Sequence, residues 1–275
     1  MKKLGIIVAC CLSSMAAQAQ ELYVFSEPAS NMPAHSVGIR QQIKRVKGIT
    51  KNDGGTRSTT EVMFGATKNW MLHTAITFSD MYSPYLRAES FRVYGKYRFF
   101  SHDALYHHLR MAVFGEASYS GNDKMYDELS IDGDLLGVQA GLIVTQLLHK
   151  LAISATGSYV NSPVGKDDHA GPSTPQHAFS YSLSAGYLLF PVKYTSYEQT
   201  NVNLYCELLG QRYFSRSLYY VDLAPALQFI FNSQTKLNIG YRYQINGNMR
   251  RMGTQGWLLG MEWLFLRKPK PLVSK

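Results

Sequence analysis

The chain has 275 residues, of which 45% are hydrophobic and 17% are charged, and it carries 19 Tyr and 13 Phe. Soluble proteins usually have about a quarter of their residues charged, so this composition favours a surface that meets lipid. The net charge of +9 does not indicate nucleic-acid binding, because the basic residues are spread along the chain rather than gathered in one patch.

Residues 1–19 have the pattern of a secretory signal peptide. Lys2 and Lys3 form a basic start, residues 4–11 form an apolar stretch, and residues 17–19 (Ala-Gln-Ala) provide a small-residue cleavage site. The apolar stretch is too short for a membrane-spanning helix. The pattern therefore predicts export of the mature chain.

The next stretch, residues 20–35, contains Pro28 and Pro33. It is either an extended periplasmic lead-in or a plug that folds into the lumen of the domain that follows. Extended proline-containing segments make poor independent domains. Of the two interpretations, we expect the periplasmic lead-in.

From residue 36 to residue 266, apolar and polar side chains alternate with a period of two. In the clearest stretch, Phe91 and Val93 share one face while Arg92 and Lys96 share the other. Successive side chains of a strand point to opposite faces, so the alternation indicates amphipathic strands. About twelve strands are predicted, at residues 36–47, 57–67, 70–79, 88–100, 109–120, 135–147, 151–161, 177–190, 201–212, 217–231, 236–245 and 254–266.

The connections between these strands alternate in length. Those after the even-numbered strands are mostly short, whereas 48–55, 121–134 and 161–176 are longer and rich in Gly, Asp and Ser. Outer-membrane barrels have short periplasmic turns and longer external loops. We therefore predict an all-β, transmembrane, antiparallel up-and-down barrel at residues 36–266, with both termini and a basic tail at 267–275 in the periplasm.

The signal peptide, the alternating hairpins and the terminal aromatic strand at 257–265 resemble those of outer-membrane β-barrel proteins of Gram-negative bacteria. Residues 21–24, 27–34, 145–151 and 228–233 are also similar to a largely uncharacterised barrel family from Bacteroidetes-type bacteria. The resemblance implies an outer-membrane location and dependence on the barrel-insertion machinery. It implies no activity, catalytic residue or cofactor.

Charged residues on the predicted inner face are the candidates for function. Basic members come from the first, fourth and fifth strands, and the facing wall of the sixth to eighth strands carries small residues such as Ser158, Ser180 and Ser184. The small residues leave space in the lumen. The lumen-lining candidates are Arg40, Lys44, Arg92, Lys96, Arg98, Arg110, Glu116, Glu207, Asp222, Arg242 and Glu262.

The predicted register brings some of these charges together. It places Arg92 opposite Glu116, Arg98 opposite Arg110, and Arg40 opposite Glu262 across the closure of the barrel. The first and third contacts neutralise charge, but the second brings like charges together. Like charges at short range are costly unless water or an anion lies between them.

A bulky basic wall facing a small hydroxyl-rich wall favours a narrow or gated channel for a small solute, with a preference for anions. The alternative is a non-conducting structural or interaction barrel that acts through its external loops. A lipid-modifying barrel enzyme is a weaker hypothesis, because His73 precedes Ser79 but is expected to point inward. The expected partners are outer-membrane lipid and lipopolysaccharide, with no nucleic acid.

Two polar clusters contain residue types that can bind metals. His102, Asp103, His107 and His108 fall in one predicted periplasmic turn, but they lack a fixed ligand spacing. The acidic residues of the loop at 121–134 lack an EF-hand pattern. Both are expected to be solvated, and no metal or other cofactor is predicted.

Overall fold

The computed structural model describes residues 23–48, 54–104, 107–163, 175–192 and 198–266. The predicted signal peptide and the predicted basic tail lie outside these ranges. Within them, no helix is long and apolar enough to cross a membrane.

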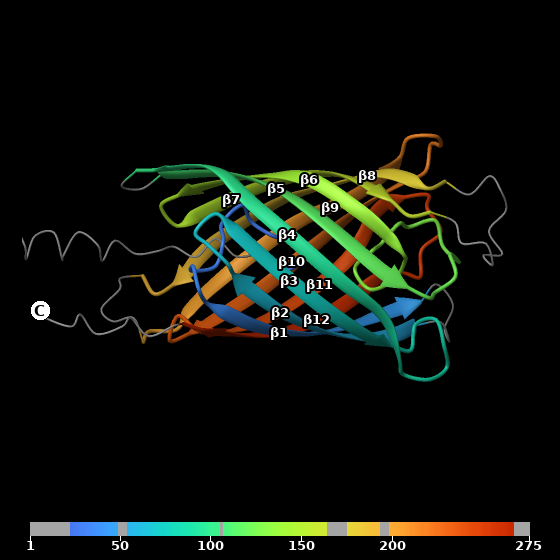
Figure 1. The fold of residues 1–275 in the computed structure, drawn as a ribbon, viewed down its shortest axis with the longest axis horizontal. Helices are drawn as coiled ribbons and strands as arrows, with labels where there is room; N and C mark the ends of the chain where they lie inside the picture. Colours follow the sequence, from blue (N-terminus) through green and yellow to red (C-terminus); the bar gives the residue numbers. More distant parts are fainter. Residues whose placement is uncertain (1–22, 49–53, 105–106, 164–174, 193–197, 267–275) are drawn as a thin grey trace, which may run out of the picture.

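Twelve antiparallel strands form a closed barrel in which each strand pairs with its neighbours in sequence and β1 pairs with β12 (Figure 1). This confirms the predicted fold class and strand number, and most boundaries agree within three residues. The strands are β1 (Val37–Gly48), β2 (Gly54–Gly65), β3 (Trp70–Ser79), β4 (Arg87–Asp103), β5 (His107–Ser120), β6 (Gly137–Leu148), β7 (Leu151–Asn161), β8 (His177–Phe190), β9 (Asn201–Tyr213), β10 (Tyr219–Phe231), β11 (Thr235–Gly247) and β12 (Gly253–Phe265).

The period of two sorts the side chains as predicted. Phe91 is 51% exposed and Trp257 is 60% exposed on the outer face, whereas Lys96 is fully buried inside. Strands tilt around the barrel axis, as closure requires (Figure 1). The outer face therefore forms an apolar belt, with members that include Ile39, Ile43, Leu72, Ile76, Val93, Val113, Leu142, Leu183, Leu204, Leu227, Ile239 and Leu259.

One turn differs from the prediction. Strands β4 and β5 extend into the residues that were predicted to form the turn, so His102, Asp103, His107 and His108 all lie within strands. The ladder between β4 and β5 also lies two residues away from the predicted register, so Arg98 pairs with Ala112. The predicted like-charge pair of Arg98 and Arg110 is therefore wrong.

The other predicted pairings have different outcomes. Arg40 pairs with Glu262 across the closure, as expected. Arg92 pairs with Ser118 rather than with Glu116 in the ladder. The Arg92 side chain nevertheless reaches Glu116 at 3.0 Å, so the predicted neutralising contact is present.

Two segments enter the barrel from outside the sheet. We call residues 23–36 the lumen segment and residues 121–136, which connect β5 to β6, the inward loop. Tyr23 and Val24 pack against Leu147, Tyr205 and other buried apolar residues. The lumen segment therefore lies inside the barrel, which corrects the expected periplasmic lead-in.

The inward loop has its own apolar anchor. Leu129, Ile131 and Leu135 pack against Val160, Tyr213 and neighbouring residues of the barrel wall. Burial of side chains of this size stabilises the folded position by about 1.5–3 kcal/mol each. The loop is therefore a packed part of the fold, which corrects its expected solvated state.

Candidate functional site: a polar chamber between two inward segments

Arg40 on β1 is the centre of an ion-pair network inside the barrel. Its guanidinium lies 2.7 Å from Glu27 of the lumen segment, 3.2 Å from Glu61 of β2 and 3.1 Å from Glu262 of β12. Lys236 of β11 also contacts Glu262. The network thus joins the lumen segment to four strands beside the closure of the barrel.

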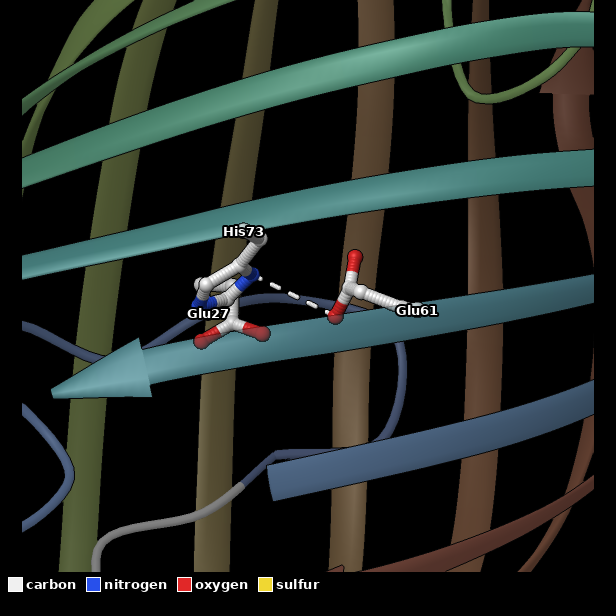
Figure 2. A group of neighbouring side chains, drawn as sticks. All are labelled: Glu27, Glu61 and His73. Carbon is white, nitrogen blue, oxygen red and sulfur yellow. Dashed lines mark ion pairs between the residues drawn. The ribbon is translucent and has the colours of Figure 1, made fainter. Parts of the chain in front are cut away.

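Figure 2 shows Glu27, Glu61 and His73 close together, with the Nδ1 atom of His73 3.3 Å from Glu61. Their ligand atoms lie within 4.8 Å of one another, a spacing that could hold a metal ion. Arg40 contacts both carboxylates, and Arg92 lies 2.8 Å from Glu61. A divalent cation would have to displace these guanidiniums, so the group is better explained as part of the ion-pair network.

The inward loop brings further carboxylates to the basic wall. Asp132 contacts Lys44 of β1 and lies 3.0 Å from Arg92 of β4. Asp134 contacts Arg57 of β2. The basic wall predicted from the sequence is present, but the folded loop neutralises much of it.

Glu128 of the inward loop joins a second buried network near β10 and β11. It lies 2.9 Å from Arg251 and 3.5 Å from Arg242, and both arginines also contact Asp222. Burial alone would raise the pKa of Glu128, but the two guanidiniums outweigh this effect and lower that pKa to about 2. The carboxylate is therefore charged at neutral pH and holds the loop to the wall.

Acidification is expected to weaken this contact. Because the pKa of Glu128 is lowered on folding, its stabilisation is complete above the ordinary value of 4.5 and is lost as the pH falls towards 2. Between pH 5 and pH 2.5, the wild-type barrel should lose on the order of 1–2 kcal/mol more unfolding free energy than Glu128→Gln. Chemical unfolding at a series of pH values measures this difference, and equal losses in the two proteins would contradict the assignment.

Glu207 of β9 binds the lumen segment without a cation. Its side chain is fully buried and accepts hydrogen bonds from the backbone N–H groups of Val24 and Phe25, at 2.9 and 2.8 Å. The hydroxyls of Ser26 and Ser184 also donate to it. In the described part of the chain, no basic side chain lies within ion-pair distance of this carboxylate.

On the other side of the lumen, a positively charged residue binds the same segment. Lys96 of β4 is fully buried and donates to the carbonyl oxygens of Pro28 and Ser30, at 2.7 and 2.8 Å. Thr145 of β6 accepts a hydrogen bond from the backbone N–H of Ala29 at 2.9 Å. The lumen segment is thus held across the barrel by β4, β6 and β9.

A chamber of about 300 Å³ lies between the two inward segments. The lumen segment and Glu128 to Asp132 of the inward loop both contribute to its lining. One side carries charged residues such as Arg40, Lys44 and Arg92, and the other carries hydroxyl and amide groups such as Ser158 and Gln211. The chamber is polar, as the sequence predicted, and both inward segments form part of its boundary.

The eleven predicted lumen residues lie in four places in the structure. Arg40, Lys44, Arg92, Glu116, Arg242 and Glu262 line the chamber. Lys96 and Glu207 lie against the lumen segment, and Asp222 is buried beside Arg251. Arg98 bonds to the carbonyl of Lys68 at the exposed strand end, and Arg110 bonds to Ser30 and Asp103.

Sequence reasoning missed the residues that reach the lumen from outside the sheet. These are chiefly Glu27 of the lumen segment and Glu128, Asp132 and Asp134 of the inward loop. A signal for the lumen segment was present: Glu207 is predicted to face inward, yet its ladder partners are Ser184 and Ala224, neither of which is a cation. A buried charge without a wall partner requires one from elsewhere in the chain.

A closed antiparallel barrel with an apolar outer belt and a polar interior defines a transmembrane β-barrel. Every strand edge is paired within the barrel, so the backbone is satisfied in lipid. Barrels of this architecture occupy outer membranes, and the protein is an outer-membrane barrel of this class.

Solved outer-membrane barrels have similar folds. An outer-membrane channel from Pseudomonas putida F1 matches with a TM-score of 0.55 at 11% identity, covering 88% of this chain and 99% of the channel. The KdgM porin matches with a TM-score of 0.50 at 9% identity, covering 82% of this chain and 98% of the porin. Likeness at these identities concerns the fold alone. No family model and no curated protein matches the chain.

Proposed function

We propose that the protein is a gated outer-membrane channel for a small, anionic solute, closed in the conformation described here. The observation that carries the proposal is the polar chamber between the lumen segment and the inward loop. A barrel with a purely structural role would need neither a chamber nor a set of buried charges arranged around it. The lumen segment belongs to no strand, so it can leave the lumen without breaking the barrel.

Departure of the lumen segment would change the charge of the opened lumen. Glu27 would leave with the segment, and Arg40 and Lys96 would each lose a carboxylate neighbour. Fixed positive charge in a low-dielectric passage attracts anions. Opening and anion preference are therefore coupled in this proposal.

Selectivity measurements on Lys44 test the proposal. Lys44 lines the chamber, whereas Lys47 of the same strand is exposed on the outer face. One charge about 8 Å from a passing ion in water changes its energy by ~0.5 kcal/mol, which is about twofold in permeability. Removal of this charge acts on the anion and the cation in opposite directions. In planar bilayers, Lys44→Gln should therefore lower the chloride-to-potassium permeability ratio about fivefold, and Lys47→Gln should leave it unchanged. Equal ratios in both variants, or no conductance from the wild-type chain, would refute the proposal.

The non-conducting barrel is the second candidate, because the two inward segments fill much of the lumen. It predicts no conductance in any variant that keeps the barrel folded. A lipid-modifying enzyme has less support, since His73 and Ser79 are both buried inside the barrel rather than facing lipid. From the sequence resemblance we also propose that the protein belongs to the Bacteroidetes-type barrel family. We further propose that its apolar belt contacts lipopolysaccharide.

A further inference from the structure

The wall of the lumen contacts the lumen segment mainly through main-chain groups. Glu207 accepts two consecutive backbone N–H groups, Thr145 accepts a third, and Lys96 donates to two carbonyl oxygens. These five main-chain groups fall within residues 24–30. Since every peptide carries the same groups, the contacts are not restricted to this segment.

The charged members of this wall depend on the segment for their partners. Among the described residues, each hydrogen-bond or ion-pair partner of Lys96 belongs to the lumen segment. Glu207 has only Ser184 besides the segment. Buried charges without direct partners are costly. The wall therefore favours states in which a peptide chain lies against it.

One side-chain contact adds a charge preference. Glu27 lies 2.7 Å from Arg40 and 3.7 Å from Lys96, so two cations face the same carboxylate. The hydroxyl of the preceding Ser26 donates to Glu207 at 2.6 Å. The wall thus combines main-chain recognition with a place for one acidic side chain.

We infer that Glu207, Thr145, Lys96 and Arg40 form a binding site for short acidic peptides in an extended conformation. The chain's own residues 24–30 occupy the site here and act as an internal competitor. A peptide from solution binds when it displaces them. That such a peptide is the transported solute rests on the proposed channel function, but the binding site itself does not.

The test uses the full-length protein and a labelled nonapeptide with the sequence of residues 23–31. A tethered segment competes at an effective concentration of about millimolar, so the native chain should bind the free peptide poorly. The double variant Ser26→Ala, Glu27→Gln weakens the internal competitor. In fluorescence anisotropy titrations, the double variant should bind the native peptide at least about tenfold more tightly than the native chain does.

Two matched controls locate the binding. In the double-variant background, Thr145→Val removes the acceptor for a peptide N–H, and Thr156→Val makes the same change at a chamber residue with no described contact to the segment. The first should weaken binding about tenfold and the second should not. A peptide with Gln in place of its Glu should also bind about tenfold more weakly than the native peptide.

The outcomes separate this inference from the channel proposal. Absence of peptide binding, equal binding to both Thr variants, or equal binding of the peptide with Gln in place of its Glu overturns the peptide site, whatever the conductance. Conductance by the double variant without peptide binding leaves the channel proposal intact. Peptide binding without conductance in bilayers refutes the channel and keeps the site.

Discussion

Replacing Asp222 with Asn is expected to lower the free energy of unfolding of the barrel by about 3 kcal/mol. Asp222 is 1% exposed on the inner face of β10, and its carboxylate lies 2.8 Å from Arg251. Arg242 contacts it as well. Loss of this carboxylate leaves the buried guanidinium of Arg251 and the partly exposed one of Arg242 to share Glu128. Removing one partner of a buried ion pair is strongly destabilising, because it leaves the other charge uncompensated.

The same substitution at an exposed ion pair tests whether the loss of stability depends on burial. Asp103 pairs with His108 and Arg110, but its side chain is 50% exposed. Asp103→Asn should cost less than about 1 kcal/mol, because water screens and solvates exposed pairs. Urea unfolding of both variants in the same lipid measures the contrast. Similar losses in the two proteins would show that the buried network does not anchor the wall.

The Asp222 network also links stability to the position of the inward loop. Arg251 bonds to Asp222 and to Glu128, so one guanidinium joins β10 to the loop. It also lies 3.7 Å from the ring centre of Tyr220, a contact that favours a cation. Loss of Asp222 is therefore expected to loosen the loop as well as the wall.

The strands could be predicted because their signal is local. A lipid-facing side chain such as Phe91 or Trp257 has to be apolar whatever the distant chain does, so the period of two is visible in the sequence alone. The pairing of the first strand with the last was predictable as well, since a closed barrel must join them, but closure alone does not determine the register that places Arg40 opposite Glu262. Fold class and orientation of most side chains follow from these constraints.

The filling of the lumen could not be predicted in the same way. The backbone of Val24 bonds to Glu207, 183 residues away in sequence. No local pattern encodes such a contact, because it depends on the volume that twelve closed strands leave inside. The small residues Ser158 and Ser184 did indicate space, but the chain itself fills much of it.

Register errors had a separate physical cause. From Ser90 to Arg98 the ladder lies two residues away from the predicted register, a shift that keeps every side chain on its predicted face and so leaves no trace in the alternation. A bulge between Arg98 and Phe100 adds one more residue, so Ser101 rather than Arg98 faces Arg110. Bulges change which residues oppose each other without changing composition or alternation on either side. The predicted pair therefore failed, although the two strands were correctly identified as neighbours.

The second large effect is expected in conductance. Glu207→Gln removes the charge that accepts the backbone N–H groups of Val24 and Phe25 and turns amide hydrogens towards them. Hydrogen bonds to a charged group contribute about 1.5–3 kcal/mol, so loss of one such bond shifts the docking equilibrium of the lumen segment by about tenfold or more. Bilayer recordings should show an open fraction at least about tenfold above that of the wild-type chain.

Asn203 provides the matched control for this change. It is buried on the inner face of the same strand and bonds to Gln228, with no described contact to the lumen segment. Asn203→Ala should leave the open fraction near its wild-type value, even if it lowers stability slightly. An equal rise in both variants would mean that loosening β9, rather than releasing the segment, opens the lumen. Unchanged conductance in Glu207→Gln would instead show that the apolar contacts of Tyr23 and Val24 are enough to hold the segment in place.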